Sequence, residues 1–303
     1  MGTPEFAVPS LRALVEAGHD LCGVFTQPDR PKNRGMRLQP TPIKEYAMSK
    51  EIPVYQPATL KDGTALAQIK ALAPELIVVA AYGRILPKEL LDCPPLGCVN
   101  VHSSLLPKYR GAAPINWAVI HGETETGVTI MHMAPELDAG DIILQQSTPI
   151  GPDETAAQLH DRLACIGGEL IAKAVSMLED GTAPRHPQDP SKATYAPMLS
   201  RELSPIDWTK SAKEIHDQVR GLIPWPATTT QVIGGRTVKI FSTAVAGRTV
   251  SAAPGAILAA GGEGIDIACG GGTVLRVLEL QAEGKRRMTA AEYLRGNPIA
   301  ITG

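Results

Sequence analysis

The sequence predicts an α/β domain with a parallel sheet and helices on both faces, followed by a small antiparallel β-barrel domain. Over residues 1–180, short apolar runs alternate with helix-like segments, which is typical of a doubly wound sheet. Four prolines between residues 182 and 200 indicate a linker. After the linker, glycines separate short β-branched runs, as in small barrels. We therefore expect domains at residues 1–181 and 201–303, joined by a linker at residues 182–200.

The first domain is predicted to contain strands at residues 21–26, 76–81, 97–101 and 127–133. Residues 76–81 are continuously apolar, which indicates a strand buried on both faces. Helices are expected at residues 4–17, 41–50, 61–72, 113–121 and 155–178. The last is the clearest helix, with Asp153 as its expected N-cap and Gly181 just beyond its end.

The second domain is predicted to begin with a helix at residues 211–221. Strands are then expected at residues 228–233, 236–241, 265–268 and 273–280, where β-branched residues predominate. Such short strands at close spacing favour an antiparallel arrangement that closes on itself.

The beginning of the chain is unusual for a doubly wound domain, which normally opens with a strand. Here Gly2-Thr3-Pro4 opens directly on a turn and a helix, the pattern expected immediately after a first strand. Either the domain lacks a strand that should lie near the centre of its sheet, or Met1 is not the true start. We expect the second, a start placed too late.

Composition excludes several classes of protein. There is no run of eighteen apolar residues, and the first residues do not form a basic segment followed by an apolar one, so neither a membrane span nor a secretory signal is predicted. The five cysteines are widely scattered and indicate no disulfide framework. We expect a cytoplasmic protein, and a monomer, because no surplus apolar stripe is evident.

Positive charge is concentrated in two places, although the net charge is −2. Residues 201–303 hold twelve Lys and Arg against nine Asp and Glu, a balance of +3, which leaves −5 for residues 1–200. Within that acidic part, residues 28–44 carry five basic side chains against Asp29 alone: Arg30, Lys32, Arg34, Arg37 and Lys44. A basic loop and a mildly basic C-terminal part suit a polyanionic partner, although exposed loops are often simply charged and solvated.

Candidate catalytic residues lie at the C-terminal end of the strand predicted at 97–101. Asn100 and His102 are two positions apart, so on a strand they point to the same side. Open α/β sheets bind ligands at this end of their strands. Two hydrogen-bonding side chains there can converge on one ligand atom, although the same pair can also merely fasten the following loop.

Asp138 lies farther along the chain, in the loop Leu137-Asp138-Ala139-Gly140 between two predicted strands. An aspartate beside a histidine raises the imidazole pKa and selects its tautomer. Asn100, His102 and Asp138 would therefore suit direct acyl transfer to an amine, which needs an oxyanion stabiliser and a proton path but no protein nucleophile. The alternative is that Asp138 serves only as a turn residue.

Other catalytic and metal motifs do not occur. The sequence contains no phosphate-binding P-loop, no Gly-x-Gly-x-x-Gly after a strand and no Gly-x-Ser-x-Gly elbow. Cys93 and Cys98 have the wrong spacing for a zinc knuckle, and His121-Gly122-Glu123 lacks the cysteine pair of a deaminase. We expect no metal.

The central motif resembles that of the formyltetrahydrofolate-dependent formyltransferases. The resemblance rests on Asn100-x-His102, on Ser104-Leu105-Leu106-Pro107 with Arg110-Gly111 and Pro114, and on Asp138. It implies a Rossmann-like α/β domain, 10-formyltetrahydrofolate as formyl donor, and Asn100, His102 and Asp138 as the catalytic trio. By the same resemblance, Ser104, Leu105, Leu106 and Pro107 would lie against the folate. The loop of Tyr82, Gly83 and Ile85 would help to bind its pterin end.

Two further stretches resemble the methionyl-tRNA formyltransferase branch of that family. The first runs from Thr26-Gln27-Pro28-Asp29-Arg30-Pro31 through Arg34-Gly35 to Pro40-Thr41-Pro42-Ile43-Lys44, and the second is Pro224-Trp225-Pro226-Ala227. They imply a basic loop that engages the tRNA acceptor end and a C-terminal, OB-like barrel that binds tRNA. The tRNA-binding residues would be Arg30, Lys32, Arg34, Arg37 and Lys44, and the acceptor would be initiator methionyl-tRNA.

Three alternatives remain open from sequence. A sugar-nucleotide N-formyltransferase would use the same trio, and Lys108-Tyr109-Arg110-Gly111 and Asn116-Trp117 fit that branch equally well. A formyl-folate hydrolase would not need the basic loop. A non-catalytic RNA- or folate-binding module would not need the trio. Residues 26–44 and the C-terminal half favour the tRNA branch.

Overall fold

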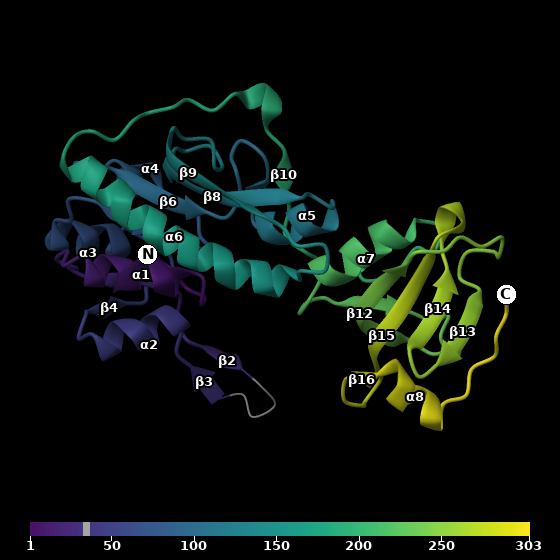
Figure 1. The fold of residues 1–303 in the computed structure, drawn as a ribbon. Coiled ribbons are helices and arrows are strands. Elements are labelled where there is room, and N and C mark those ends of the chain that lie inside the picture. Colours follow the sequence, from purple (N-terminus) through teal and green to yellow (C-terminus); the bar gives the residue numbers. More distant parts are fainter. Residues whose placement is uncertain (33–36) are drawn as a thin grey trace. The chain divides into compact units, whose positions relative to one another are not determined.

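The computed structural model describes residues 1–32 and 37–303, which form two compact units (Figure 1). The first unit comprises residues 1–114, 125–148 and 160–196, and the second comprises residues 115–124, 149–159 and 197–303. Most of the segment predicted to be a linker, residues 182–196, is therefore part of the first unit. Among the described residues, no helix is long and apolar enough to cross a membrane.

The sheet of the first unit is in two pieces. One piece is the parallel pair β1 (Val24–Phe25) and β4 (Val54–Tyr55). The other has the order β5 (Ile77–Val79), β6 (Cys98–His102), β8 (Glu125–His132) and β9 (Ile142–Pro149). Strands β5 and β6 are parallel, but β6 and β8 are antiparallel. The prediction of a parallel sheet is therefore wrong for β8. This strand is buried along most of its length, and a buried strand can pair in either direction.

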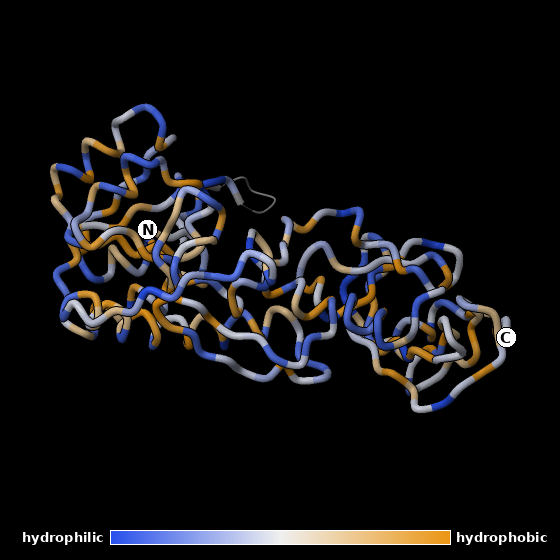
Figure 2. The backbone as a smooth tube through the Cα atoms, turned by 90° about the horizontal axis from the view of Figure 1, so that it is seen from above, coloured by the Kyte–Doolittle hydropathy of each residue, from blue (hydrophilic) through white to orange (hydrophobic). Residues whose placement is uncertain are grey.

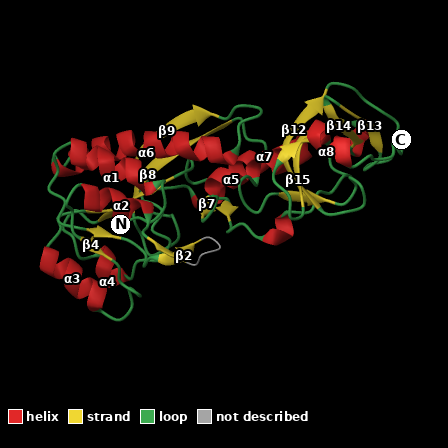
Figure 3. Cartoon of the chain, turned by 90° about the horizontal axis from the view of Figure 1, so that it is seen from below, coloured by secondary structure: helices red, strands yellow, loops and turns green. Residues whose placement is uncertain are grey.

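Helices cover both faces of this sheet, as predicted. They are α1 (Ala7–Glu16), α2 (Pro42–Ser49), α3 (Thr64–Leu72), α4 (Lys88–Leu91) and α6 (Ala156–Glu179). Helices α1 and α6 lie on one side of the unit, and α3 and α4 on the other (Figure 3). Helix α6 packs closely enough on β6 that a Cβ on Gly167 would lie 2.8 Å from Val101 Cγ1. On the opposite face, Cys98 Sγ is 3.7 Å from Leu90 O of α4. Because side chains alternate along a strand, Asn100 and His102 share the face of Cys98.

Residues Met1 and Gly2 bridge the two pieces of the sheet. The Met1 amine donates to Val78 O at 2.6 Å, and Gly2 N donates to Phe25 O at 3.0 Å. Upstream of this bridge, a cavity of ≈ 230 Å³ has Leu11, Leu14, Ile69 and Ile77 among its lining residues. Met1 and Gly2 therefore link β5 to β1 through backbone hydrogen bonds.

A hairpin of β2 (Arg30–Lys32) and β3 (Arg37–Gln39) projects before α2. Helix α2 begins as predicted, with Thr41 as N-cap accepting from Lys44 N. A second short pair, β7 (Arg110–Gly111) and β10 (Tyr195–Ala196), is parallel and joins segments far apart in sequence. The sequence predicts neither pair, because two- and three-residue ladders leave no periodic signal.

The second unit is an antiparallel sheet in the order β11 (Thr228–Thr230), β12 (Val238–Ala246), β15 (Val274–Ala282), β14 (Gly264–Ala268) and β13 (Ile257–Gly261). Strand β16 (Met288–Thr289) also pairs with β15. Helices α7 (Ala212–Gly221) and α8 (Ala290–Gly296) contact the sheet. Their apolar sides meet buried strand residues including Ile240, Ile267 and Val277. Hydrophobic stretches occur throughout both units (Figure 2). The predicted helix 211–221 and four predicted strands are confirmed, whereas β13, β16 and α8 were not predicted.

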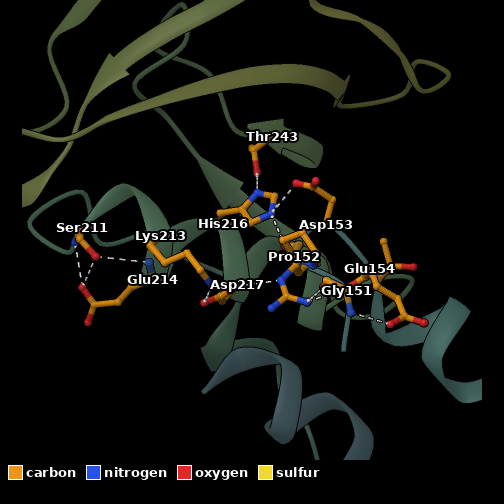
Figure 4. Close-up of polar contacts among 12 residues, drawn as sticks. Gly151, Pro152, Asp153, Glu154, Ser211, Lys213, Glu214, His216, Asp217 and Thr243 are labelled. Carbon is orange, nitrogen blue, oxygen red and sulfur yellow. Dashed lines mark hydrogen bonds and ion pairs between the residues drawn. The ribbon is translucent and has the colours of Figure 1, made fainter. Parts of the chain in front are cut away.

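Buried polar contacts fasten residues 151–154 to α7 (Figure 4). The imidazole of His216 contacts Thr243 Oγ1 at 2.9 Å, Pro152 O at 3.1 Å and the carboxylate of Asp153 at 3.3 Å. The guanidinium of Arg220 donates to Asp217 at 2.8 Å and to Glu154 O at 2.9 Å. The prediction that Asp153 caps α6 is therefore wrong.

The cap of α6 is Thr155 instead. Its hydroxyl accepts from Gln158 N at 3.3 Å, and the Gln158 side chain accepts from Thr155 N at 3.0 Å. Both residues can cap a helix, and the ion pair of Asp153 with a distant histidine could not be read from local sequence.

Candidate active site

Asn100, His102 and Asp138 come from two segments that meet at the C-terminal end of β6. Within the antiparallel ladder, Asn100 lies opposite Met131 and His102 opposite Thr129. Asp138 lies in the loop between β8 and β9, and its Oδ2 is 3.7 Å from His102 Nδ1. The side chain of Asp138 is only 12% exposed. The structure thus brings His102 and Asp138 together, while Asn100 is half-buried on the same face of β6.

The contacts of His102 determine how its ring is oriented. Its Nε2 lies 3.0 Å from Tyr109 O, and a carbonyl can only accept, so Nε2 carries a proton. The Nδ1 atom then faces the Asp138 carboxylate at a distance too long for a hydrogen bond. If Nδ1 is protonated as well, both ring N–H groups face acceptors. The pair can therefore accommodate an imidazolium, and His102 also fastens the loop that follows it, so both roles considered from sequence are compatible.

Asp138 is held in an uncommon backbone conformation. Its φ of 48° lies in the left-handed region, which aspartate tolerates better than most residues. Its Oδ2 accepts from Gly111 N at 2.8 Å. A Cβ on Gly140 would lie 1.8 Å from His132 O, so the loop passes too close to β8 for any other residue. Asp138 is a turn residue, as the alternative held, but the turn aims its carboxylate at the loop of His102.

The segment predicted to lie against folate follows His102 directly. The Ser104 hydroxyl donates to Lys108 O at 2.7 Å, and Leu106 N donates to Thr129 Oγ1 at 3.1 Å. Ser104 and Leu106 are buried, whereas Leu105 and Pro107 are partly exposed. Only the latter two side chains can offer a surface to a ligand, and the buried ones maintain the shape of the loop.

The predicted pterin loop also contains both exposed and buried residues. Gly83 is exposed, and Ile85 is 84% exposed, an unusual state for a large apolar side chain that suits contact with a ligand. The Tyr82 side chain is 1% exposed and packs in the core near α4, so in this structure it supports the loop from the core. Its carbonyl accepts from Thr3 Oγ1 and Gln27 Nε2, which anchors the loop.

Among the predicted tRNA-binding residues, two have described side chains. Arg30 is exposed and donates to Gln27 Oε1 at 2.9 Å. Lys44 is only 20% exposed and donates to Asp29 Oδ2 at 2.6 Å and to Gln56 Oε1 at 2.7 Å. The hydrogen bonds from Lys44 and Gln56 lower the pKa of Asp29. Lys44 therefore braces the base of the hairpin, with its charge paired to Asp29.

The remaining predicted residues border the undescribed part of the chain. Lys32 and Arg37 face each other across the β2–β3 ladder. Arg34 lies outside the described residues. The structure thus places the hairpin that carries this basic loop without describing its tip.

Sequence reasoning missed a second layer of residues around the trio. Gln188 accepts from Arg110 Nη2 at 2.7 Å and donates to the carbonyls of Asp138 and Gly140, both at 2.8 Å. Thr194 accepts from Tyr109 N at 2.9 Å. Their proline-rich surroundings resemble an ordinary linker, so no local signal could have identified them. Among the described residues, no group of three or more His, Cys, Asp or Glu is placed to hold a metal ion.

Comparison with known families covers nearly the whole chain. The family model for formyl transferase matches residues 1–175, and that for the formyl transferase C-terminal domain matches residues 198–298. The methionyl-tRNA formyltransferase of Pelobacter propionicus is 51% identical over 300 residues, which cover 99% of this chain and 93% of the relative. The chain belongs to the methionyl-tRNA formyltransferases. A further member, from Alkaliphilus oremlandii, is 48% identical over 99% of this chain and 96% of its own length.

Solved structures of more distant proteins share the fold. The N-formyltransferase of Helicobacter canadensis, in complex with folinic acid and dTDP-3-aminofucose, has a TM-score of 0.69 at 20% identity, covering 93% of this chain and 97% of its own. HypX of Aquifex aeolicus, in complex with tetrahydrofolic acid, has a TM-score of 0.63 at 18% identity, covering 93% of this chain and 48% of its own.

The sugar-nucleotide alternative is disfavoured by this contrast. Methionyl-tRNA formyltransferases are about half identical to the chain over almost its full length, whereas the N-formyltransferase in complex with dTDP-3-aminofucose is 20% identical. The central motif, which the two branches share, could not make this distinction. As a methionyl-tRNA formyltransferase, the chain is an enzyme of formyl transfer, so the non-catalytic alternative is disfavoured too.

Proposed function

We propose that this chain transfers the formyl group of 10-formyltetrahydrofolate to the α-amino group of initiator methionyl-tRNA, with Asn100, His102 and Asp138 as its catalytic residues. The observation that carries the assignment is the meeting of the Asp138 carboxylate and the His102 ring at the end of β6. This end of the strand is where open α/β sheets bind ligands. We further propose that the enzyme acts in the cytoplasm as a monomer, without a membrane partner.

In the proposed reaction, the neutral amine attacks the formyl carbon, and the bond from that carbon to N10 of the folate breaks. Asn100 would donate to the oxyanion that develops on the formyl oxygen. Protonated His102 would add a positive charge near the same oxygen, with Asp138 balancing that charge. Asp138 would also accept the proton that the amine loses and help to pass this same proton to the departing nitrogen. No covalent bond to the protein is needed.

The folate would lie along the segment after His102 and the loop before α4. Leu105, Pro107 and the exposed Ile85 offer apolar surface, which a flat aromatic ring system can cover. Gly83 is exposed in the same loop and has a φ of 74°. These features indicate a ligand-facing surface. The buried side chains of Tyr82, Ser104 and Leu106 would hold the two loops in shape.

The β2–β3 hairpin and the C-terminal unit would supply tRNA affinity, chiefly through phosphate contacts. We expect Arg30→Ala to weaken tRNA binding and to reduce the slope of log affinity against log salt by about 1, because one phosphate contact is lost. The measurement is equilibrium tRNA binding at several salt concentrations. Lys88→Ala, which removes an exposed lysine paired with Asp92 on α4, is the matched control. An unchanged salt slope in Arg30→Ala would remove this residue from the interface.

A parallel acceptor assay tests the proposed activity. The purified chain would receive 10-formyltetrahydrofolate with either charged initiator methionyl-tRNA or an amino-sugar nucleotide. Formylmethionyl-tRNA is the expected product. Formation of a formylated sugar would support the proposed chemistry but contradict the proposed acceptor. Release of formate without an acceptor would indicate a hydrolase.

A further inference from the structure

Residues 186–196 lie against both catalytic loops of the first unit, although their composition suggests a linker. At one end, His186 exchanges backbone hydrogen bonds with Ile142, at the start of β9. At the other end, Arg110 N donates to Thr194 O at 2.8 Å, and Ala112 N donates to Ala196 O at 2.9 Å. This segment thus touches the loop that follows His102 and the strand that follows Asp138.

Within this segment, the side chain of Gln188 makes hydrogen bonds to both loops. Its Oε1 accepts from Arg110 Nε at 3.1 Å and Nη2 at 2.7 Å, and its Nε2 donates to Asp138 O and Gly140 O at 2.8 Å each. The amide orientation follows from chemistry, because a flipped amide would direct its NH₂ group at the guanidinium and its oxygen at two carbonyls. Both donors and both acceptor sites of the carboxamide are therefore used.

Gln188 connects Arg110 with the turn that holds Asp138, one of the proposed catalytic residues. Asp138 has a positive φ, and its carboxylate reaches Gly111 N and faces His102. Arg110 is 7% exposed, so its guanidinium depends on protein acceptors in place of water. Gln188 donates hydrogen bonds to the carbonyls on both sides of Ala139. These bonds limit rotation of the Asp138 peptide and so fix the position of the Asp138 carboxylate relative to His102.

We propose that Gln188 is a positioning residue for formyl transfer. Its carboxamide couples Arg110 to the Asp138 turn and so sets the separation between the Asp138 carboxylate and the His102 ring. This inference rests on the proposed function, because it assigns Gln188 to the same catalytic trio. A displacement of about 1 Å in such a site can cost roughly a hundredfold in rate.

Two substitutions separate the bonds that Gln188 makes. Gln188→Glu retains the shape and the acceptor for Arg110 but loses both donors, whereas Gln188→Met loses every hydrogen bond with little change in volume. We expect each variant to lower kcat by about 10- to 100-fold with KM for both substrates within about threefold of the wild type. The pH dependence of kcat should also shift, because the Asp138–His102 pair is altered. Asp189→Asn, in the same segment and bonded to its neighbour Ser191, is the matched control and should match the wild type.

A structural role alone would give a different pattern. A loss of kcat that accompanies a loss of thermal stability, with an unchanged pH profile of kcat, would overturn the proposal. A wild-type kcat in Gln188→Glu would also overturn it. Hydrogen exchange at Gly111 N, which donates to Asp138, reports the coupling without turnover. Faster exchange of this amide in both Gln188 variants than in Asp189→Asn would support the coupling, whether or not the wild type forms formylmethionyl-tRNA. A failure of the wild type to form formylmethionyl-tRNA would count against the proposed function alone. Unchanged exchange overturns the coupling.

Discussion

Replacing Asn100 with alanine, or His102 with asparagine, is expected to lower kcat for formyl transfer by about 10²- to 10³-fold. Each substitution removes a donor or a charge from the site where the oxyanion is proposed to form, and single oxyanion donors typically contribute this much. KM should change much less, because the lost interaction is made mainly in the transition state. The measurement is steady-state transfer to initiator methionyl-tRNA, with circular dichroism to verify folding.

A matched control is available for the histidine. His160, in α6, is partly exposed and pairs with Asp161, so His160→Asn should retain wild-type turnover. Near-normal turnover in both Asn100→Ala and His102→Asn would show that these residues only shape the loop, as their positions at the end of a strand also allow. Asp138→Asn retains an acceptor for Gly111 N but removes the charge, and it should be impaired like the other two.

Extending the chain before Met1 by a short apolar strand, Val-Ile-Val, is expected to raise the free energy of unfolding by about 5 kcal/mol. The cavity beside Met1 measures ≈ 230 Å³ and is lined by apolar side chains together with His19, Asp20, Glu75 and Glu179. Each Val or Ile side chain buried there contributes about 1.5–3 kcal/mol. The added residues would also pair with the chain near β1 and β5, on either side of the bridge that Met1 and Gly2 now form. Thermal and denaturant unfolding of the two chains is the measurement.

An extension of Gly-Ser-Gly is the matched control, because it moves the terminal amine equally far but offers no apolar side chain. Equal gains from both extensions would show that the cavity is not a strand site. A loss of stability with Val-Ile-Val would show that β1 and β5 cannot accept a strand between them.

The buried amine of Met1 adds a pH dependence to the same experiment. Burial lowers its pKa from 8.0 to about 6, so the unfolded chain binds more protons between these values. Stability of the 303-residue chain therefore falls as pH decreases from 8 to 6, by about 3 kcal/mol in total. Both extensions should abolish this contribution, because they move the charged amine away from Val78.

The elements that the sequence predicted well are those whose signal is local. Helix α2 (Pro42–Ser49) lies within the helix predicted at residues 41–50, and β6 (Cys98–His102) overlaps the strand predicted at residues 97–101. Strand direction was not predictable, since a buried strand such as β8 is compatible with either pairing. The cap of α6 was misplaced because Asp153 finds a partner in His216, sixty-three residues away in the sequence.

In the candidate site, too, the features with a local signal were predictable and those that depend on packing were not. Asn100 and His102 could be placed side by side from sequence because strand alternation is a local rule. Which of the surrounding side chains face a ligand depended on packing: Tyr82, Ser104 and Leu106 are buried, and Ile85 is exposed. The pairing of Lys44 with Asp29 was likewise invisible, because fifteen residues of chain separate them.

The sequence by itself determined the α/β class, the second antiparallel unit, the family and the residue types that formyl transfer requires, since each depends on local periodicity or on a contiguous motif. Only the tertiary structure decided how the reacting groups are held. The approach of Asp138 to His102, the clamp of Gln188 on the Asp138 turn and the cavity beside Met1 all depend on contacts between distant segments. Such contacts arise from the packing of the whole unit, and no short stretch of sequence specifies them.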